Sequence, residues 1–481
     1  MYLFEHGQTG TCARVSIIAL LLAAGLGLSA CDKSEDSAEP KAESKEAEKT
    51  EGKADEKAEG DEGAAKADES DGPKMAKSEP IEEKGAAYFG VSNFGLVELS
   101  ADGKFSRVGK KISMTTDMAT APDGTTYLAA VGGVYRAKDG KLETIGDYNS
   151  VGSVKRIAAG ADGVVWGTSF KGVHKWDGKS WSTMAKADLG KEVKLIKDIA
   201  VGPEGEVIAV SSNKVHVMKD GKWTAEDTSA IDAKPFFDEV EFGPDGSVFT
   251  TGNHGVAMRK DGTWSVVDMK ERFASASFLS VGADGTVHAA KRTGDVWAIS
   301  GGEVRKLSTK DKLGASSVHT VAGDGQGRTW IGTNNGIVIW KPDGSHVQWK
   351  PGTIDQLRGK VEAITVTKGG PTLPEVGPQK KGAVTGKVLK DGSPLEGVEV
   401  EACESPSTMF RKSPCDDKPV KFSGKTDEKG VFTFEGVPVG SYGFAIKPSP
   451  KEKWRVTLAF DCCAKLQEGK TYDVGSFDLS R

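Results

Sequence analysis

The chain has 481 residues, of which 37% are hydrophobic, and it contains 61 glycines and 10 tryptophans. This is enough apolar material for two or three domains with packed cores. The net charge is −5, and residues 32–83 alone hold 9 lysines against 19 acidic residues. The rest of the chain is therefore weakly basic with scattered charges, which excludes the concentrated basic surface of a nucleic-acid-binding protein.

The first hydrophobic segment is VSIIALLLAAGLGL at residues 15–28. It is short for a membrane span and is followed by small residues, which indicates the core of an export signal. Residues 28–31, LSAC, resemble the bacterial lipobox. The resemblance implies that residues 1–30 are a signal peptide and that Cys31 is lipidated. The alternative is an ordinary signal peptide with an incidental cysteine. We expect a location in the cell envelope, with a lipid anchor in a bacterial membrane on its periplasmic or cell-surface side.

Residues 31–83 consist mainly of Lys, Glu, Ala, Asp, Ser and Gly. A segment with so few apolar side chains cannot offset the entropy of ordering itself, so we predict a disordered acidic tether. A charged single helix is the alternative, but Gly52, Gly60, Gly63 and Pro73 interrupt it.

A repeat of about forty residues follows the tether. Its marker is the glycine of a tight turn, which recurs every 39 to 42 residues, at Gly85, Gly124, Gly163, Gly205, Gly246, Gly285, Gly327 and Gly369. Each complete copy holds about four short β-rich runs between turns, as in DGVVWGTSFKGVHKWDGKSW at residues 162–181. This period and strand content are typical of the blades of a β-propeller.

Residues 84–370 are therefore predicted to form an all-β, seven-bladed propeller with four-stranded blades. The first copy lacks its innermost strand, whereas a lone run, VEAITV at residues 361–366, follows the seventh copy. Pairing of these N-terminal and C-terminal strands would close the ring and remove its exposed edges. An eight-bladed ring would need a further partial copy, and an open solenoid would leave both ends unpaired.

The blade sequences also resemble known propellers. GRTWIGTNNGIVIW at residues 327–340 and GVVWGTSFKGVHKW at residues 163–176 are similar to the repeats of periplasmic two-component-regulator propellers. GPDG at residues 243–246, followed by VFTTG, resembles the blades of virginiamycin B lyase-type propellers. These motifs are turn and packing residues, so the resemblance implies the fold and little about function.

The first strand of each blade is expected to line the central channel. Seven residues before each marker glycine, near the channel mouth, the column reads Asp117, Arg156, Asp198, Glu239, Phe278, Thr320 and Glu362. Four acids in one ring could hold a divalent cation or a cationic ligand, with Asp198, Glu239, Glu362 and nearby His319 as the chosen groups. The alternative is a polar, solvent-filled channel in which Arg156 neutralises the acids as ion pairs. No other cofactor is predicted.

The loops between the second and third strands face the same end of the propeller. They supply Lys171, His254, Arg292 and Asn334, which we predict to contact a sugar or a peptide. Asn tolerates left-handed turn conformations, so a role in the hairpin alone is the alternative. The resemblance to virginiamycin B lyase-type enzymes implies a further alternative, a catalytic role in which His254 or His319 acts with an acid and a divalent metal.

Residues 371–381 read as a linker to a second domain at residues 382–481. The turns and alternating runs GKV at 386–388, DGSPLEGVEV at 391–400 and TDEKGVFTF at 426–434 resemble the carboxypeptidase regulatory-like domain, a small transthyretin-like β-sandwich. That family's domain carries no zinc or peptidase residues, so the resemblance implies a stabilising or interaction module.

The second domain holds Cys403, Cys415, Cys462 and Cys463. The export signal implies an oxidising compartment, so we predict disulfides rather than a metal cluster. Four cysteines allow three pairings. Adjacent side chains of a strand point to opposite faces, which favours Cys403 and Cys415 each bonding one of Cys462 and Cys463.

These features predict a membrane-anchored envelope lipoprotein whose propeller binds a peptide, a glycan or an envelope protein, in a sensor or scaffold role. Two alternatives remain. One is a metal-assisted lyase or lactonase acting in the channel, and the other is a structural hub without a small-molecule ligand. No catalytic residues are assigned, and no nucleic-acid partner is expected.

Overall fold

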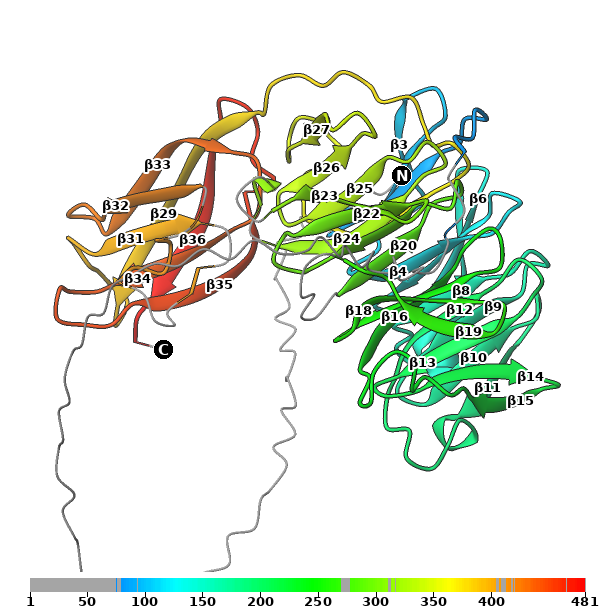
Figure 1. Ribbon diagram of the computed structural model, residues 1–481. Coiled ribbons are helices and arrows are strands. Elements are labelled where there is room, and N and C mark those ends of the chain that lie inside the picture. Colours follow the sequence, from blue (N-terminus) through cyan, green and yellow to red (C-terminus); the bar gives the residue numbers. More distant parts are fainter. Residues whose placement is uncertain are drawn as a thin grey trace, which may run out of the picture. The chain divides into compact units, whose positions relative to one another are not determined.

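The computed structural model describes residues 75, 79–92, 94–269, 277–309, 313–315, 317–403, 406–407, 412–416, 418, 420–463 and 465–480 (Figure 1). The predicted signal peptide, Cys31 and most of the predicted tether lie outside these ranges. Within them, no helix has both the length and the apolar character needed to cross a membrane.

Seven four-stranded antiparallel sheets follow one another between residues 87 and 366. The first joins β1 (Ala87–Val91), β2 (Gly95–Leu99) and β3 (Phe105–Val108) to β28 (Val361–Val366). The second contains β4 (Thr115–Thr120), β5 (Thr126–Ala130), β6 (Gly133–Lys138) and β7 (Lys141–Asp147). The third contains β8 (Arg156–Ala159), β9 (Val165–Thr168), β10 (Gly172–Trp176) and β11 (Trp181–Ala185).

Four further blades complete the series. Blade 4 contains β12 (Ile196–Val201), β13 (Val207–Ser211), β14 (Val215–Lys219) and β15 (Lys222–Ala225). Blade 5 contains β16 (Phe237–Phe242), β17 (Val248–Gly252), β18 (Gly255–Lys260) and β19 (Thr263–Val266). Blade 6 contains β20 (Phe278–Val281), β21 (Val287–Ala290), β22 (Val296–Ser300) and β23 (Glu303–Ser308). Blade 7 contains β24 (Val318–Gly323), β25 (Thr329–Thr333), β26 (Gly336–Trp340) and β27 (His346–Trp349).

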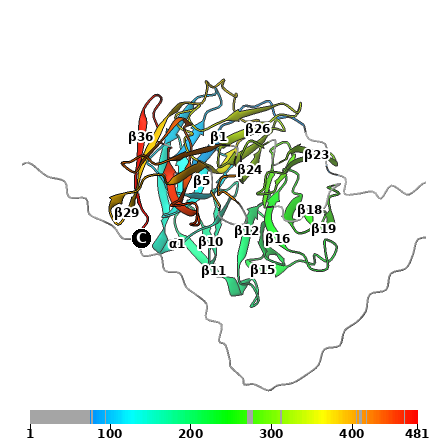
Figure 2. The ribbon, with the colours of Figure 1, turned by 90° about the vertical axis from the view of Figure 1, so that its left-hand side faces the viewer.

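The innermost strands contact one another in sequence from β4 through β8, β12, β16, β20 and β24 to β28, and β28 returns to β4. Figure 2 shows the strands of blades 3 to 5 following one another. Strand β28 pairs antiparallel with β1, with Ala87 opposite Val366 and Val91 opposite Val361. The predicted propeller of four-stranded blades is confirmed, and the strand that was expected to complete the first blade does so.

Apolar side chains fill the space between neighbouring blades. Between blades 7 and 1, the rings of Phe89 and Trp330 lie 6.0 Å apart, and those of Phe105 and Trp349 lie 5.4 Å apart. Trp330 and Trp349 are fully buried. These two tryptophans therefore pack between blades.

The tight turns need glycine for steric reasons. Gly163 has φ 77°, in the left-handed region that glycine adopts at little cost. Gly172, at the start of β10, has φ 149°, and a Cβ there would lie 2.0 Å from the backbone oxygen of Met184. The regular spacing of such positions is what made the blades countable.

Contacts with the propeller begin before residue 84. The backbone N–H of Ile81 donates to the oxygen of Gly325, 2.6 Å away, in the turn between β24 and β25. Met75 packs against a buried cluster of blades 5 and 6. Met75 and Ile81 are the large apolar residues of the predicted tether, which explains why the segment joins the fold there.

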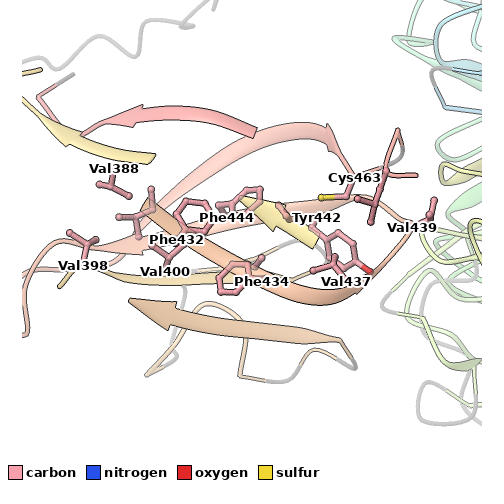
Figure 3. Packing of buried hydrophobic residues seen from close by; sticks show 14 residues of the cluster. Val388, Val398, Val400, Phe432, Phe434, Val437, Val439, Tyr442, Phe444 and Cys463 are labelled. Atoms are coloured by element: carbon pink, nitrogen blue, oxygen red, sulfur yellow. The ribbon is translucent and has the colours of Figure 1, made fainter. Parts of the chain in front are cut away.

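Two sheets form the C-terminal β-sandwich. One contains β29 (Lys381–Lys390), β30 (Ser393–Pro394), β33 (Val431–Pro438) and β36 (Thr471–Asp478), and β36 runs parallel to β29. The other contains β31 (Glu399–Cys403), β32 (Lys421–Lys425), β34 (Tyr442–Lys447) and β35 (Arg455–Cys462). Figure 3 shows Phe432, Phe434 and Phe444 at the centre of the core, together with valines of both sheets.

The predicted disulfide pairing is wrong. Cys403, at the end of β31, bonds Cys415, only 12 residues later, and the structure gives Cys463 as disulfide-bonded too. The prediction rested on strand alternation at positions 462 and 463. It did not include the loop after β31, which returns Cys415 to the strand that it leaves. Cys403 and Cys415 are both fully buried.

Removing this bridge should destabilise the sandwich moderately. The double change Cys403→Ser and Cys415→Ser releases a short loop, for which chain entropy predicts a loss of about 2–3 kcal/mol. Urea unfolding of the purified chain would measure the loss. Peptide mapping without reduction should recover the two segments as one linked species, and recovery of residue 403 linked to residue 462 or 463 would contradict the assignment.

Candidate functional site

The central channel is lined by the innermost strand of every blade. It encloses a cavity of about 360 Å³, and Asp117, Arg156, Asp198, Glu239 and Glu362 are all on its wall. All five come from the predicted column at the channel mouth. We call the end of the propeller at which the innermost strands begin the mouth face, and the opposite end, with the Asp-Gly turns, the turn face.

Irregular strand pairing shapes this mouth. The pairing shifts between Thr115 and Asp117 in β4, between Ile196 and Asp198 in β12, and between Val318 and Thr320 in β24. An extra residue at such a bulge redirects the neighbouring side chains. The column residue therefore follows a bulge in several blades, a feature that the repeat spacing did not reveal.

Three acids of the column are used to join neighbouring blades. Asp117 Oδ2 accepts a hydrogen bond from the N–H of Ile157 at 2.9 Å, and Asp198 Oδ2 accepts one from Val240 at 2.9 Å. Glu239 Oε2 accepts one from Leu279 at 2.6 Å. An innermost strand is the edge of its own sheet, so its outward N–H groups need such partners. The acids are thus links from one blade to the next.

Arg156 provides the positive charge of this cluster. Its Nη2 lies 2.6 Å from Glu239 Oε1, and its Nε lies 3.8 Å from Asp198 Oδ1. The neighbouring carboxylates raise the pKa of Arg156 although burial opposes them. Of the two predicted interpretations, the ion pairing through Arg156 is the one that these contacts match.

Burial leaves the acids weaker than usual. It raises the pKa of Asp198 to about 7 and that of Glu239 to about 8, while Arg156 acts in the opposite direction. The pKa of Asp117 is raised for the same reason. One arginine cannot neutralise all of these carboxylates, so part of the cluster keeps its protons near neutral pH.

Sequence reasoning missed Glu241. Its Oε2 accepts a hydrogen bond from the N–H of Val281 at 2.8 Å, which links blades 5 and 6 a second time. Burial raises its pKa well above the ordinary value. Because side chains alternate along a strand, Glu241 lies on the same side of β16 as Glu239, and a search two residues below the column would have found it.

Replacing Glu241 by glutamine should stabilise the protein more at pH 8 than at pH 5. An unfolded glutamate ionises near pH 4, whereas the folded one keeps its proton to higher pH, so its contribution to stability falls as the pH rises above 4. Glutamine retains an oxygen for Val281 and cannot ionise. Relative to the wild type, the free energy of unfolding of the glutamine variant should increase by about 1 kcal/mol or more from pH 5 to pH 8.

Urea unfolding of both proteins at pH 5 and pH 8 measures this gain. Comparing variant with wild type cancels the histidines, whose lowered pKa values change stability in the opposite direction between about pH 4 and 6.5. The exposed strand residue Glu303 offers a matched Glu→Gln control, with the same effect expected at both pH values. A gain that is larger at pH 5 would contradict the raised pKa.

The chosen cation-binding set is not assembled. Glu362 Oε1 accepts from Ser92 Oγ at 2.5 Å and lies 3.6 Å from Lys360 Nζ. His319 Nε2 lies 3.3 Å from Ser317 Oγ, and burial lowers its pKa to about 4. The described part of the chain contains no group of three or more His, Cys, Asp or Glu that could hold a metal ion.

The loop residues have different surroundings. Lys171 is exposed, and Arg292 is exposed with its guanidinium 5.0 Å from the ring centre of Phe278. His254 packs edge-on against Phe237 at 5.4 Å, and burial lowers its pKa to about 4. Asn334 Oδ1 accepts from the N–H of Ser317 at 3.0 Å, so its side chain holds the adjacent loop.

Comparison with solved structures found several that are similar to parts of this chain. A streptogramin B lyase structure is 14% identical, covers 50% of this chain and 83% of its own, and has a TM-score of 0.42. Virginiamycin B lyase from Staphylococcus aureus is 13% identical, with coverages of 49% and 84% and a TM-score of 0.41. The WD40 repeats of RRP9 are 10% identical, with coverages of 53% and 84% and a TM-score of 0.40. No family model and no curated protein matches the chain.

Proposed function

We propose that this protein is a lipid-anchored envelope protein whose propeller is a rigid scaffold for binding another macromolecule. The observation that carries the proposal is the use of the channel acids. Asp117, Asp198, Glu239 and Glu241 accept backbone N–H groups of the next blade. These bonds stiffen the ring and occupy the groups that a channel ligand would need, which leaves recognition to the surface of the mouth face.

The anchor is proposed from the sequence. Residues 15–28 and the LSAC motif support export and lipidation of Cys31. Growth with labelled fatty acid should label the wild type and leave the variant Cys31→Ser unlabelled. A Cys31→Ser protein that still carries the label would overturn this part of the proposal.

The sandwich is proposed to be a carboxypeptidase regulatory-like module, on the resemblance of its turns. Its own fourteen-residue buried cluster gives it an independent core. We assign it a stabilising or interaction role beside the propeller.

Crosslinking in intact cells tests the scaffold function. With the full chain expressed at its normal level, we expect a small set of envelope proteins to be recovered after crosslinking and purification. A different propeller protein, unrelated in sequence and exported to the same place, serves as the control. Recovery of the same proteins from both, or of none, would overturn the proposal.

A further inference from the structure

Exposed large apolar side chains gather at one end of the propeller. They lie in the connections between blades, in the loops between second and third strands, or at the last residue of β19, and all of these positions are on the mouth face: Met114, Val131, Tyr148, Phe170, Leu195, Phe236 and Val266. Their exposed fractions range from 37% to 67%. The turn face of the described chain carries no member of this set.

Two of these residues touch through the backbone. The N–H of Val131 donates to the oxygen of Met114 at 3.1 Å, and the side chains are 53% and 56% exposed. Met114 has φ 47°, an unfavourable conformation for a residue with a side chain. Asp139, Asp220 and Asp261 share this conformation, but they are aspartates of tight turns. Lys368, in the turn after β28, has φ 49° as well, so Met114 differs from the other residues in being a large apolar side chain that is also exposed.

The next blades continue the pattern with aromatic residues. Tyr148, at the start of α1 (Tyr148–Val151), is 64% exposed, and Phe170 is 67% exposed. Lys171 passes close to Gly152 at the end of α1. Further along, the ammonium group of Lys197 lies 4.6 Å from the ring centre of Phe236. Apolar and cationic groups are thus neighbours in successive blades.

The loops of this set that belong to blades 2 to 4 are strongly basic, whereas the connection before β16 holds Glu226, Asp227 and Asp232 against Lys234. Between residues 109 and 214, the segments on the mouth face hold eight lysines, namely Lys110, Lys111, Lys155, Lys171, Lys186, Lys191, Lys194 and Lys214. They hold three acids, of which Asp147 caps α1 and Glu192 pairs with Lys214 at 2.6 Å. This balance contrasts with the net charge of −5 of the whole chain.

We propose that this region, the mouth face of blades 2 to 4, docks an acidic polypeptide segment that carries apolar side chains. The inference rests on the scaffold function proposed above and names the chemistry of the partner. The lysines match negative charge, and the exposed apolar residues supply the buried anchors that hold most protein interfaces together.

The chain's own acidic segment fits this surface poorly. Residues 32–83 supply the charge, but their only large apolar residues are Met75 and Ile81, and both pack elsewhere. Ile81 reaches the propeller at Gly325, on the turn face. The scaffold function proposed above favours a separate polypeptide as the occupant of this surface, and binding of lipid is an outcome that the test below can reveal.

Site-specific photo-crosslinking of the full chain in cells tests the inference. A photoreactive amino acid replaces Phe170 on the mouth face and, as the control, the exposed Lys179 on the turn face. We expect residue 170, and not residue 179, to capture one polypeptide, and the mapped crosslinked peptide to be acidic with an apolar residue at the contact. Lys110→Glu with Lys111→Glu and Lys171→Glu should reduce capture at least about fivefold, as expected for loss of a dominant contact.

Met114→Gly separates binding from folding. Glycine accepts the positive φ of this position, so the urea midpoint should not fall, while capture at residue 170 should drop about fivefold with loss of the anchor. Capture of lipid, capture of a peptide without acidic character, or capture that is indifferent to both sets of changes would overturn the inference. If a partner is captured only from position 179, the scaffold function stands and this inference fails; if neither position captures one, both fail.

Discussion

Replacing Asp324 by alanine is expected to lower the free energy of unfolding by about 3–5 kcal/mol, as for other broken buried ion pairs. Asp324 is fully buried. Its Oδ2 accepts from Arg328 Nε at 2.6 Å and from Trp330 Nε1 at 2.7 Å. Its Oδ1 accepts from the N–H groups of Gln326 and Arg328. Alanine would leave these donors and the charge of Arg328 without their partner.

Replacing Asp324 should cost more stability than replacing an aspartate of an ordinary turn, because Arg328 extends the hydrogen bonds of Asp324 to a further segment. Its Nη1 donates to the oxygen of Pro371 at 3.0 Å, and its Nη2 donates to that of Gly369 at 2.8 Å. The pair therefore ties blade 7 to the chain that leaves β28, where the ring closes. Releasing Arg328 should loosen that closure.

Urea unfolding followed by tryptophan fluorescence measures the effect. Asp162→Ala is the matched control, because Asp162 is an exposed turn aspartate whose side chain accepts only the N–H of Val164, at 3.0 Å. Its loss should stay within about 1 kcal/mol. Equal losses for the two variants would show that Asp324 acts as an ordinary turn residue.

Arg156→Met should be the second most damaging change, with a loss of about 3–5 kcal/mol at pH 8. Methionine keeps much of the side-chain volume and removes the cation from among Asp117, Asp198 and Glu239. The loss should be clearly smaller at pH 5. The raised pKa values of Asp198 and Glu239, about 7 and 8, mean that both can then be protonated and need no counter-charge.

Arg136→Met provides the control for this prediction. Arg136 forms an ion pair with Glu143 at 2.7 Å, but both side chains are well exposed. Such pairs contribute little, so the expected loss is below about 1 kcal/mol and similar at both pH values. An Arg156→Met protein that loses more stability at pH 5 than at pH 8 would refute the neutralising role of Arg156.

The blades were predictable because their tight turns use glycine at positive φ, as at Gly163, and these turns recur at a fixed period. Closure was predictable because an unpaired strand at one end of the repeats needs a partner. The role of Asp117 was not predictable from the sequence. Its partner is a backbone N–H of the next blade, and a backbone N–H does not identify itself by residue type. A ring of acids in sequence looks the same whether it binds a cation or holds strand edges.

Asp324 illustrates a second limit. In other blades the corresponding turn position is alanine or glycine, as at Ala121, Gly160 and Gly243, so the acid is visible as an exception. The role of Asp324 depends on Arg328, which donates hydrogen bonds to the backbone after β28, about forty residues further on. The predicted disulfide pairing was wrong for a related reason. Strand alternation does not indicate where the loop after a strand places its cysteine.

The antiparallel pairing of β1 and β28 determines how the ring would respond to pulling. Ala87 begins β1 and lies opposite Val366, the last residue of β28, so both strands lead out of the propeller on the turn face. Tension between the N-terminal segment and the sandwich would peel this pair apart one hydrogen bond at a time, rather than shear all its bonds together. The load would fall first on bonds outside the pair, among them those from the N–H of Ile81 to the oxygen of Gly325 and from Arg328 to the oxygens of Pro371 and Gly369. A tethered propeller of this design would open at its seam while the other six blades stay folded.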